Sequence, residues 1–340
     1  MSKLNALIAG STGYIGIQLV KLLIKHPNIN IKYLCGNTSK GKSISYFDRS
    51  LKNKKLPKIV KFSNNLLNEV DVIFTALPNG EAQNISNKML KKNILIDLSA
   101  DFRLGSANEY LKWYKIKHKS KKNIKKSIYA LPEITKRKLI NYKIISCPGC
   151  YPTSILLPLI PLFKKKIIKL DNIIIDSKSG YSGAGRSVHK KYASKNLYES
   201  LSAYGLGFHR HNSEIQQELS KYSKKKINFT FTPHLSPMFR GILSTIYINI
   251  KSRVNINKIT SELKNFYKKD VFVKVLPINS LISTNDVINT NYCYISVCKT
   301  ADKNKLIILS AIDNLIKGGA GQAVQNLNYY FDYNAKKGLL

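Results

Sequence analysis

Short apolar runs rich in Ile and Val recur through the first 150 residues, separated by stretches with helical spacing. The expected strands are 5–9, 31–35, 71–77, 94–98, 127–131 and 143–147. Because apolar residues occupy consecutive rather than alternating positions, these strands are expected to be buried on both faces, as in a parallel sheet covered by helices. The pattern predicts an α/β domain with a Rossmann-like, doubly wound sheet.

The pattern changes after residue 150. Further strands are expected at 172–176, 228–232, 242–250, 271–276, 292–298 and 306–309, with fewer helices between them. Within 246–250, Ile alternates with Tyr and Asn, which indicates a sheet with one buried face. We predict a second, α+β domain with a mainly antiparallel sheet over 150–310, after a first domain over 1–149. A helix over 311–340 is expected to pack back on the first domain.

Length and composition agree with two ordinary domains. The chain has 340 residues, of which 44% are hydrophobic, enough for sizeable cores. Its five cysteines are odd in number and unevenly spaced, which argues against a secreted disulfide framework. The longest apolar run, 155–163, falls well short of the ~20 residues that span a bilayer. We therefore expect a cytoplasmic protein that has no membrane segment.

The net charge of +37, from 56 Lys and Arg against 19 Asp and Glu, would ordinarily indicate a nucleic-acid partner. The lysines, however, recur in almost every segment instead of gathering in one aromatic-lined groove. No RNA-binding or helix-turn-helix motif accompanies them. The sequence therefore favours a solvated charge set by biased composition over a specific nucleic-acid surface.

A glycine-rich segment directly follows the first strand and opens a helix over 14–25. Its glycines let the chain turn tightly and let backbone amides approach a pyrophosphate at the helix N-terminus. The spacing is G-x-x-G-x-x-G, not the dinucleotide fingerprint G-x-G-x-x-G. We predict that the whole segment binds a cofactor: Gly10, Ser11, Thr12, Gly13, Tyr14, Ile15 and Gly16.

The second strand ends near Cys35, where an NAD-specific enzyme usually places an acid on the ribose 2′-hydroxyl. Here the chain continues Gly-Asn-Thr-Ser-Lys-Gly-Lys and offers no acid. Ser39 and Lys40 provide a small donor and a cation in its place. This favours a 2′-phosphate, and hence NADP.

Cys150 is the candidate nucleophile. It stands between a buried strand and an apolar helix over 152–163, where the helix dipole would stabilise a thiolate. Cys147 lies within the strand and is expected to be buried. Because Cys147 and Cys150 form a C-x-x-C pair, two other interpretations stay open: a redox-active pair, or two inert core cysteines. A zinc site would need a second pair of cysteines, and Cys293 and Cys298 have the wrong spacing for it.

A thiolate beside NADP defines a reaction class in which a thioester or thiohemiacetal exchanges hydride with a nicotinamide. Such chemistry needs a general acid/base, and the run His-Arg-His-Asn-Ser-Glu at 209–214 is the cluster that suits it. His209 or His211 could act, Glu214 could orient the imidazole, and Arg210 could hold an anion. The remaining histidines stand singly: His26, His118, His189 and His234.

These residues resemble the N-acetyl-gamma-glutamyl-phosphate reductases of arginine biosynthesis, relatives of aspartate-semialdehyde dehydrogenase. The most specific matches are SCPGCYPT at 146–153 and HRHNSEI at 209–215. The others, in family order, are GSTGYIG at 10–16, DLSADFRL at 97–104, YALPE at 129–133, SGYSGAGR at 179–186 and DNLIKGGAGQAVQN at 313–326. Aspartate-semialdehyde dehydrogenase would carry a different pentad around the cysteine and no HRH block.

The resemblance implies NADPH-dependent reduction of N-acetyl-L-glutamyl 5-phosphate to the 5-semialdehyde, with Cys150 as nucleophile. It favours His209 as acid/base and Arg103 for the phosphate oxygens, and it assigns substrate contacts to Glu214 as well. Ser182 and Arg186 would face substrate or a partner subunit. The implied cofactor contacts are Gly183, Gly185, Asn314, Lys317 and Gly318. A homo-oligomer, dimer or tetramer, built through the second domain's sheet is also implied.

The chain departs from the family pattern at two places. Asn79 replaces a frequent His, and Asn212 and Ser213 follow the HRH block where Thr or Leu and then Pro are more usual. Neither departure touches the expected nucleophile. Two alternatives stay open: an aspartate-semialdehyde dehydrogenase, and a nucleic-acid-binding protein on a reductase scaffold.

Overall fold

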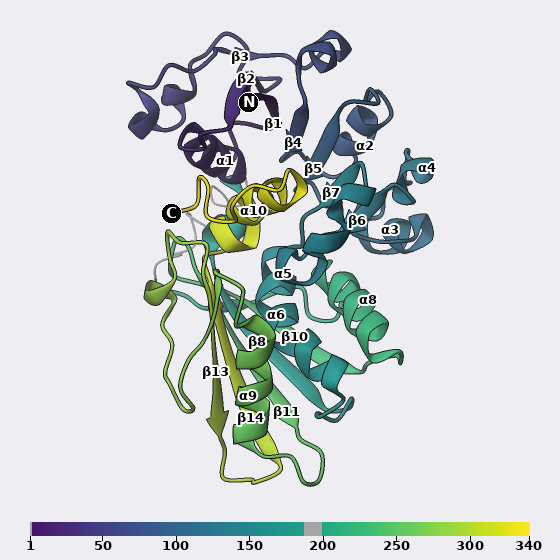
Figure 1. Cartoon of the computed structure of the whole chain (residues 1–340), viewed down its shortest axis with the longest axis vertical. Helices are drawn as coiled ribbons and strands as arrows, with labels where there is room; N and C mark the ends of the chain where they lie inside the picture. Colours follow the sequence, from purple (N-terminus) through teal and green to yellow (C-terminus); the bar gives the residue numbers. More distant parts are fainter. Residues whose placement is uncertain (1, 187–198) are drawn as a thin grey trace. The chain divides into compact units, whose positions relative to one another are not determined.

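The computed structural model describes residues 2–186 and 199–340. By its internal contacts the chain divides into two compact units (Figure 1). Unit 1 contains residues 1–148 and 319–340, and unit 2 contains residues 149–318. The last residues of the chain are therefore part of the same unit as the first.

Unit 1 is built on a parallel sheet of seven strands in the order β3-β2-β1-β4-β5-β7-β6. Its strands are β1 Leu4–Ala9, β2 Ile29–Cys35, β3 Ile59–Val60, β4 Val72–Thr75, β5 Ile94–Asp97, β6 Ser127–Tyr129 and β7 Ile144–Ser146. Strands β2 and β3 lie on one side of β1, and the chain then crosses to the other side of β1, where it forms β4. This topological switch point is where doubly wound sheets bind ligands, beyond the carboxyl ends of the strands.

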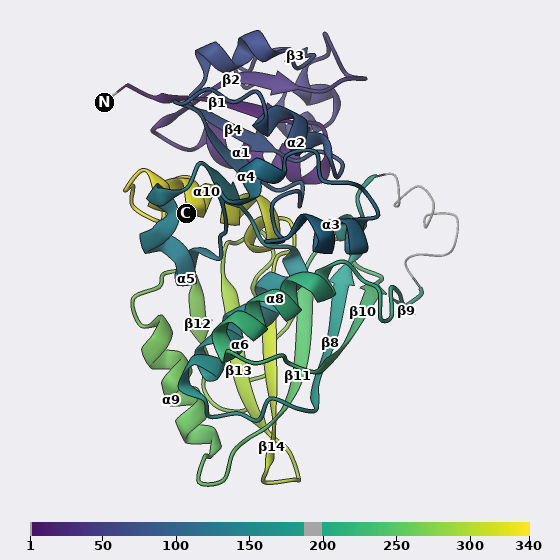
Figure 2. The same cartoon turned by 90° about the vertical axis from the view of Figure 1, so that its right-hand side faces the viewer.

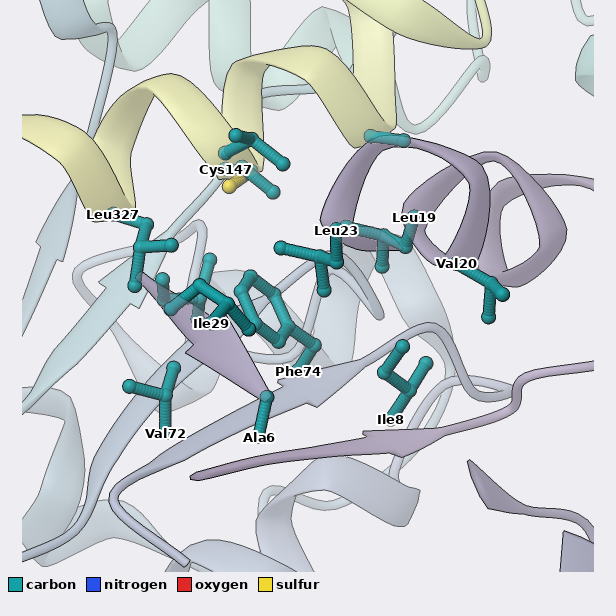
Figure 3. Packing of buried hydrophobic residues seen from close by; sticks show 14 of the residues in the cluster. Ala6, Ile8, Leu19, Val20, Leu23, Ile29, Val72, Phe74, Cys147 and Leu327 are labelled. Carbon is teal, nitrogen blue, oxygen red and sulfur yellow. The ribbon is translucent and has the colours of Figure 1, made fainter. Parts of the chain in front are cut away.

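The helices of unit 1 are α1 Tyr14–Ile24, α2 Glu81–Ser86, α3 Ala107–Tyr114, α4 Lys121–Ile124, α5 Pro132–Thr135 and α10 Gly321–Tyr330. Apolar side chains of α1 and α10 pack with those of the central strands in one core (Figure 3). Leu23, Leu327, Ile8 and Phe74 are fully buried there. The predicted Rossmann-like first unit is thus confirmed.

The predicted helix over 311–340 is wrong in extent. Residues 311 and 312 end a strand, a π-helical turn covers Ile316–Ala320, and only α10 is a regular helix. The cause is Asp313, whose Oδ1 accepts the backbone N–H groups of Leu315 and Ile316 and so starts a new turn. A helical periodicity cannot reveal this interruption, because the residues on both sides of it are buried.

Unit 2 contains a mixed sheet of seven strands in the order β12-β13-β14-β11-β8-β10-β9. Its strands are β8 Ile173–Gly180, β9 Ser202–Ala203, β10 Phe229–Ser236, β11 Ile242–Asn249, β12 Val273–Val275, β13 Cys293–Lys299 and β14 Lys305–Ile312. The pairings β8–β10 and β12–β13 are parallel and the others are antiparallel. The predicted α+β unit with a mainly antiparallel sheet is confirmed; β3 and β9, of two residues each, were not anticipated.

The helices of unit 2 among the described residues are α6 Cys150–Lys165, α8 His211–Ser223 and α9 Ile256–Tyr267. Helices α6 and α9 contact the sheet, and α8 packs on α6 (Figure 2). Side chains 151–163 of α6 are all buried, although the helix contains Pro158 and Pro161. In the described ranges, no helix combines the length and the apolar character needed to cross a membrane.

Candidate active site

The loop after β1 has the shape that a nucleotide-binding turn requires. Gly10 has φ +84°, and a Cβ there would lie 2.2 Å from the carbonyl oxygen of Ala76. A Cβ on Gly16 would lie 2.2 Å from the carbonyl oxygen of Gly10. Both positions therefore require glycine to close the turn. Ser11 is fully buried, and its hydroxyl donates to the carbonyl of Cys35, so it fixes the loop from within.

Gly13 has a different role from the other two glycines. It is the N-cap of α1, and no side chain caps this helix end. A Cβ on Gly13 would meet only the carbonyl oxygen of Gly10, at 3.7 Å. The helix N-terminus is therefore bordered here by bare backbone, beside the half-buried side chains of Thr12, Tyr14 and Ile15. This arrangement suits an anion at the positive end of the helix dipole.

The segment after β2 contains the predicted 2′-phosphate residues. Ser39 is buried and its carbonyl accepts the N–H of Lys42, whereas Lys40 is exposed. Close by is a cationic pocket of about 780 Å³ that the sequence reading missed, although its residues follow β2 within 20 positions. Its lining is Lys42, Ser43, Ser45, Tyr46, Arg49 and Lys52. The ammonium of Lys42 lies 4.5 Å from the centre of the Tyr46 ring.

Arg103 lies at the end of a turn organised by Asp97. The Asp97 carboxylate accepts the Thr75 hydroxyl and the backbone N–H groups of residues 99, 101 and 102. Burial in this site raises the pKa of Asp97 to about 6. Arg103 is almost buried, and its Nε donates to the carbonyl of Cys147 at 2.8 Å. The guanidinium therefore contacts the backbone that leads from β7 toward Cys150.

Cys150 is the first residue of α6, with Gly149 as N-cap, so the helix begins two residues before the predicted start. Its half-buried thiol forms no disulfide and lines a pocket of about 310 Å³ in unit 2. Cys147, in contrast, is fully buried, and burial raises the pKa of its thiol to about 12. Position at a helix N-terminus favours a thiolate at Cys150, while Cys147 stays protonated near neutral pH.

The two histidines of the HRH block line the same pocket as Cys150. Their ring centres are 4.7 Å apart. Nδ1 of His209 accepts the backbone N–H of His211 at 3.2 Å, which requires an unprotonated Nδ1. Burial, and next the charge of Arg210, lower the pKa of His209 to about 4. His209 is therefore a neutral imidazole at physiological pH.

His211 is directed to the turn before Cys150. Its Nε2 lies 3.8 Å from Oε1 of Glu214, and a Cβ on Gly149 would fall 2.3 Å from that nitrogen. Oε2 of Glu214 accepts the backbone N–H of Gly149 at 2.9 Å. Since Glu214 is fully buried, its carboxylate joins the HRH block to the turn that carries Cys150.

Two tyrosines that the sequence reading missed also line the pocket. The Tyr204 hydroxyl donates to that of Tyr151, which donates in turn to the carbonyl of His234. The Tyr151 ring meets that of His209 edge to face, with 5.6 Å between centres. Tyr151 directly follows Cys150 on the helix, which was the only signal available in the sequence.

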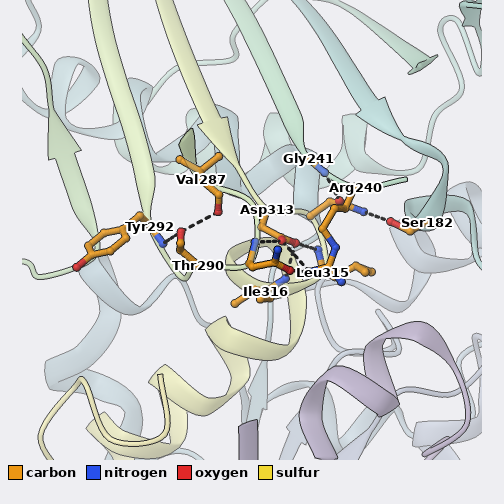
Figure 4. A network of polar contacts seen from close by, with 11 residues as sticks. Ser182, Arg240, Gly241, Val287, Thr290, Tyr292, Asp313, Leu315 and Ile316 are labelled. Carbon is orange, nitrogen blue, oxygen red and sulfur yellow. Dashed lines mark hydrogen bonds and ion pairs between the residues drawn. The ribbon is translucent and has the colours of Figure 1, made fainter. Parts of the chain in front are cut away.

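The predicted residues near the end of β14 form a buried polar network (Figure 4). Asn314 donates from Nδ2 to the Ser182 hydroxyl at 2.9 Å and accepts the N–H of Gly241 at 2.8 Å. The carboxylate of Asp313 forms an ion pair with Arg240 at 3.2 Å. Ser182 is thus held by its hydrogen bond to Asn314. Arg240 and Asp313 were not among the predicted site residues.

The other predicted residues differ in accessibility. Lys317 is fully buried, and its ammonium lies 5.9 Å from the centre of the Phe272 ring. Gly318 lies against Cys150, since a Cβ on Gly318 would be 2.6 Å from the Cβ of Cys150. Gly183 lines the pocket, Gly185 has φ +84° with open space around it, and Arg186 is exposed.

The single histidines are structural where the structure describes them. His26 and His118 are buried, and their rings contact Asn328 and the carbonyl of Asp101. His234 lies 2.9 Å from the Asp176 carboxylate. His189 lies outside the described residues.

Two family models match the chain. Residues 5–142 match the semialdehyde dehydrogenase NAD binding domain, and residues 150–314 match the semialdehyde dehydrogenase dimerisation domain. Together they cover most of the chain, and the first carries the glycine loop while the second carries Cys150 and the HRH block.

Curated relatives match over nearly the full length. A Clostridium beijerinckii N-acetyl-gamma-glutamyl-phosphate reductase is 42% identical over 98% of this chain and 96% of its own. A Thermoanaerobacter pseudethanolicus reductase of the same name is 44% identical, with 95% and 94% covered. A probable chloroplastic one from Arabidopsis thaliana is 40% identical, with 98% and 83% covered.

Solved structures support the fold independently. Aspartate semialdehyde dehydrogenase II from Vibrio cholerae has a TM-score of 0.71 at 14% identity, covering 98% of this chain and 99% of its own. The Candida albicans enzyme with NADP has a TM-score of 0.62 at 18% identity, with 96% and 98% covered. These likenesses extend to the fold alone, whereas the sequence relatives share the motifs as well. The chain therefore belongs to the semialdehyde dehydrogenase family and, within it, to the N-acetyl-gamma-glutamyl-phosphate reductases.

Proposed function

We propose that this oxidoreductase reduces N-acetyl-L-glutamyl 5-phosphate to N-acetyl-L-glutamate 5-semialdehyde and phosphate, with NADPH, in arginine biosynthesis. The observation that carries the proposal is Cys150 at the start of α6, in one pocket with His209 and His211. The matching names of the full-length relatives support the substrate.

The nucleotide end of unit 1 fits a dinucleotide. Glycines that close the turn and a bare helix N-terminus at Gly13 are what a pyrophosphate needs. Segment 10–16 would hold the pyrophosphate, and the segment after β2 would hold the adenosine ribose. When bound, the nicotinamide cofactor supplies the hydride for the reduction.

Cys150 would begin the reaction by attacking the acyl carbon of the substrate as a thiolate. A carbon–sulfur bond forms, the carbon–oxygen bond to phosphate breaks, and phosphate leaves with the bonding electrons. Reduction turns the resulting thioester into a thiohemiacetal on the same sulfur. Its collapse releases the aldehyde and restores the Cys150 thiolate.

His209 would be the acid/base, because its neutral imidazole can take the thiol proton of Cys150 before attack. It can then give that proton to the thiohemiacetal oxygen and remove it again as the aldehyde forms. His211 and Glu214 would act through position: the buried carboxylate holds the Gly149 N–H and faces the His211 ring. We therefore replace the predicted substrate contact of Glu214 with this positioning role.

Arg103 would likewise position the site, since its Nε is bonded to the carbonyl of Cys147. Its guanidinium is also the candidate for the phosphate oxygens that the sequence suggested. The face of the unit 2 sheet on which Ile174 and Tyr247 are exposed would join two copies of the chain, in line with the dimerisation-domain match.

The decisive experiment assays the purified chain for NADPH oxidation with N-acetyl-L-glutamyl 5-phosphate and, separately, with L-aspartyl 4-phosphate. We expect turnover of the acetylated glutamyl substrate, and a Cys150→Ser variant that keeps cofactor binding but loses at least ~10³-fold in kcat. Cys147→Ser is the matched control and should retain most activity. Turnover of the aspartyl substrate alone, or full activity of Cys150→Ser, would refute the proposal.

The cofactor preference has its own test. Lys42 and Arg49 line the pocket beyond β2 and would bind a 2′-phosphate through charge-assisted hydrogen bonds. We expect Lys42→Gln with Arg49→Gln to raise KM for NADPH by about tenfold or more and to leave KM for NADH nearly unchanged. Lys54→Gln with Lys55→Gln, exposed nearby but outside the pocket, is the control. An equal effect on both cofactors would contradict the assignment.

A further inference from the structure

Unit 1 carries a dense group of lysines away from the nucleotide site. Segments 86–93, 115–126 and residue 143 contain eleven lysines and no acidic residue. All eleven are exposed: Lys88, Lys91, Lys92, Lys115, Lys117, Lys119, Lys121, Lys122, Lys125, Lys126 and Lys143. Throughout the described ranges, none of their ammonium groups is paired with a carboxylate.

The fold brings these three segments together. The hydroxyls of Ser86 and Ser120 are 2.9 Å apart, and the Asn123 amide donates to the carbonyl of Ser86. The Lys143 ammonium donates to the carbonyl of Lys91 at 2.9 Å, and the Lys143 backbone N–H donates to the carbonyl of Lys126. Residues more than 50 positions apart thus form one basic surface.

This surface is hollowed into a pocket of about 360 Å³. Its lining is Ser86, Met89, Leu90, Lys91, Asn93, Asn123, Lys126, Lys143 and Ile144, with no carboxylate among them. Lys126 and Lys143 directly precede β6 and β7, so the pocket lies at the amino ends of the strands. The glycine loop follows the carboxyl end of β1, on the opposite edge of the sheet. The pocket is therefore separate from the candidate cofactor site.

Three like charges around one pocket repel one another, and a bound anion would relieve that repulsion. The charged donors are ammonium groups, without a guanidinium. An ammonium is a compact point charge with three donors and a common partner of phosphate oxygens, and three of them around one pocket suit an anion that carries more than one negative charge. Asn93 already donates to the carbonyls of Leu67 and Val70, so the lysines provide the recognition.

We propose that this pocket is a second anion site, which takes the phosphate groups of a multiply charged phosphate compound. The compound is either a free polyphosphate such as pyrophosphate or the backbone of a single-stranded nucleic acid. Both present clustered phosphate oxygens to Lys91, Lys126 and Lys143.

The test uses the full chain saturated with NADPH, so that the cofactor site cannot take the probe. Pyrophosphate binding is measured by calorimetry, and binding of a short labelled oligouridylate by fluorescence anisotropy at two salt concentrations. Lys91→Gln/Lys126→Gln/Lys143→Gln is compared with Lys264→Gln/Lys268→Gln/Lys269→Gln, which removes the same charge from exposed lysines of unit 2. Reductase activity and thermal unfolding check that both variants are folded.

We expect the pocket variant to weaken binding by at least about tenfold and the control variant by much less. Loss of pyrophosphate binding would identify a free phosphate compound as the ligand. Loss confined to the oligonucleotide, with a shallower salt dependence, would identify nucleic-acid phosphates. Equal effects of the two variants, or no binding of either probe to the unchanged chain, would overturn the proposal.

Discussion

At the residue scale, the clearest contrast is between two cysteines three positions apart. Cys147 is sealed within unit 1 with its thiol pKa raised to about 12, and Cys150 stands at a helix N-terminus on a pocket. Residue type and neighbouring elements were enough to predict this difference. They were not enough to separate His209 from His211, because both lie in one run.

The two histidines differ through contacts made by folding. His209 keeps an unprotonated Nδ1 against the His211 N–H, and its pKa lies near 4. His211 is turned toward Glu214 and the Gly149 turn. An acid/base that is neutral above pH 4 loses activity only when the medium becomes quite acidic.

We therefore expect kcat to fall as the pH is lowered through about 4. Arg210→Gln removes the neighbouring positive charge that lowers this pKa, so the acid side of the pH–kcat profile should move to higher pH. His209→Asn should lower kcat by about 10²- to 10⁴-fold. A profile that Arg210→Gln leaves unmoved, or an active His209→Asn, would show that another group is the acid/base.

At the element scale, the end of the chain shows how polar side chains anchor a helix. Buried amides on α10 reach the rest of unit 1: Gln325 donates to Glu133, and Asn326 to the carbonyl of Ala130. Asn328 accepts from the His26 ring and donates to the carbonyls of residues 335 and 337. A hydrophobic pattern does not predict such a polar attachment.

This attachment makes stability depend on pH. Burial lowers the pKa of His26 below its usual 6.5. Between the two pKa values, His26 therefore binds a proton in the unfolded chain but not in the folded chain. The contribution of neutral, buried His26 to the free energy of unfolding is complete above pH 6.5. It is lost as the pH falls toward the lowered pKa of His26 in the folded chain. In urea denaturation at pH 7.5 and 5, His26→Gln should show a smaller loss of unfolding free energy between the two pH values than the unchanged chain. An identical loss would mean that His26 does not contribute.

At the scale of the whole molecule, one face of the unit 2 sheet carries none of that unit's helices among the residues that the structure describes. Helices α6 and α9 pack against the sheet, while Ile174 and Tyr247 remain 47% and 41% exposed on its strands. The match to a dimerisation domain covers this sheet. Burial of this face against a second copy would remove its apolar side chains from water.

Ile174→Asp with Tyr247→Asp should therefore reduce the molar mass measured by light scattering, while circular dichroism stays unchanged. A charged pair on a buried interface costs several kcal/mol unless it is compensated. Ile140→Asp, at an exposed apolar residue of unit 1, is the control. An unchanged molar mass would place the interface elsewhere.

The net charge of +37 also changes meaning at this scale. The sequence indicated a positive charge spread over the whole surface, because lysines occur in almost every segment. The fold joins segments 86–93 and 115–126 with Lys143 around one pocket, and this concentration could not be read from their spacing.

The sequence by itself determined the two-unit α/β and α+β architecture, the glycine loop and the family, and it indicated Cys150 as the candidate nucleophile, because these depend on local pattern and residue chemistry. Tertiary structure alone decided what depends on distant partners. The Glu214 carboxylate meets Gly149 across 65 positions, Arg103 reaches the carbonyl of Cys147, and Asp313 ends β14 where a helix was expected. Burial and hydrogen bonding between remote segments set these roles, and no periodicity along the chain encodes them.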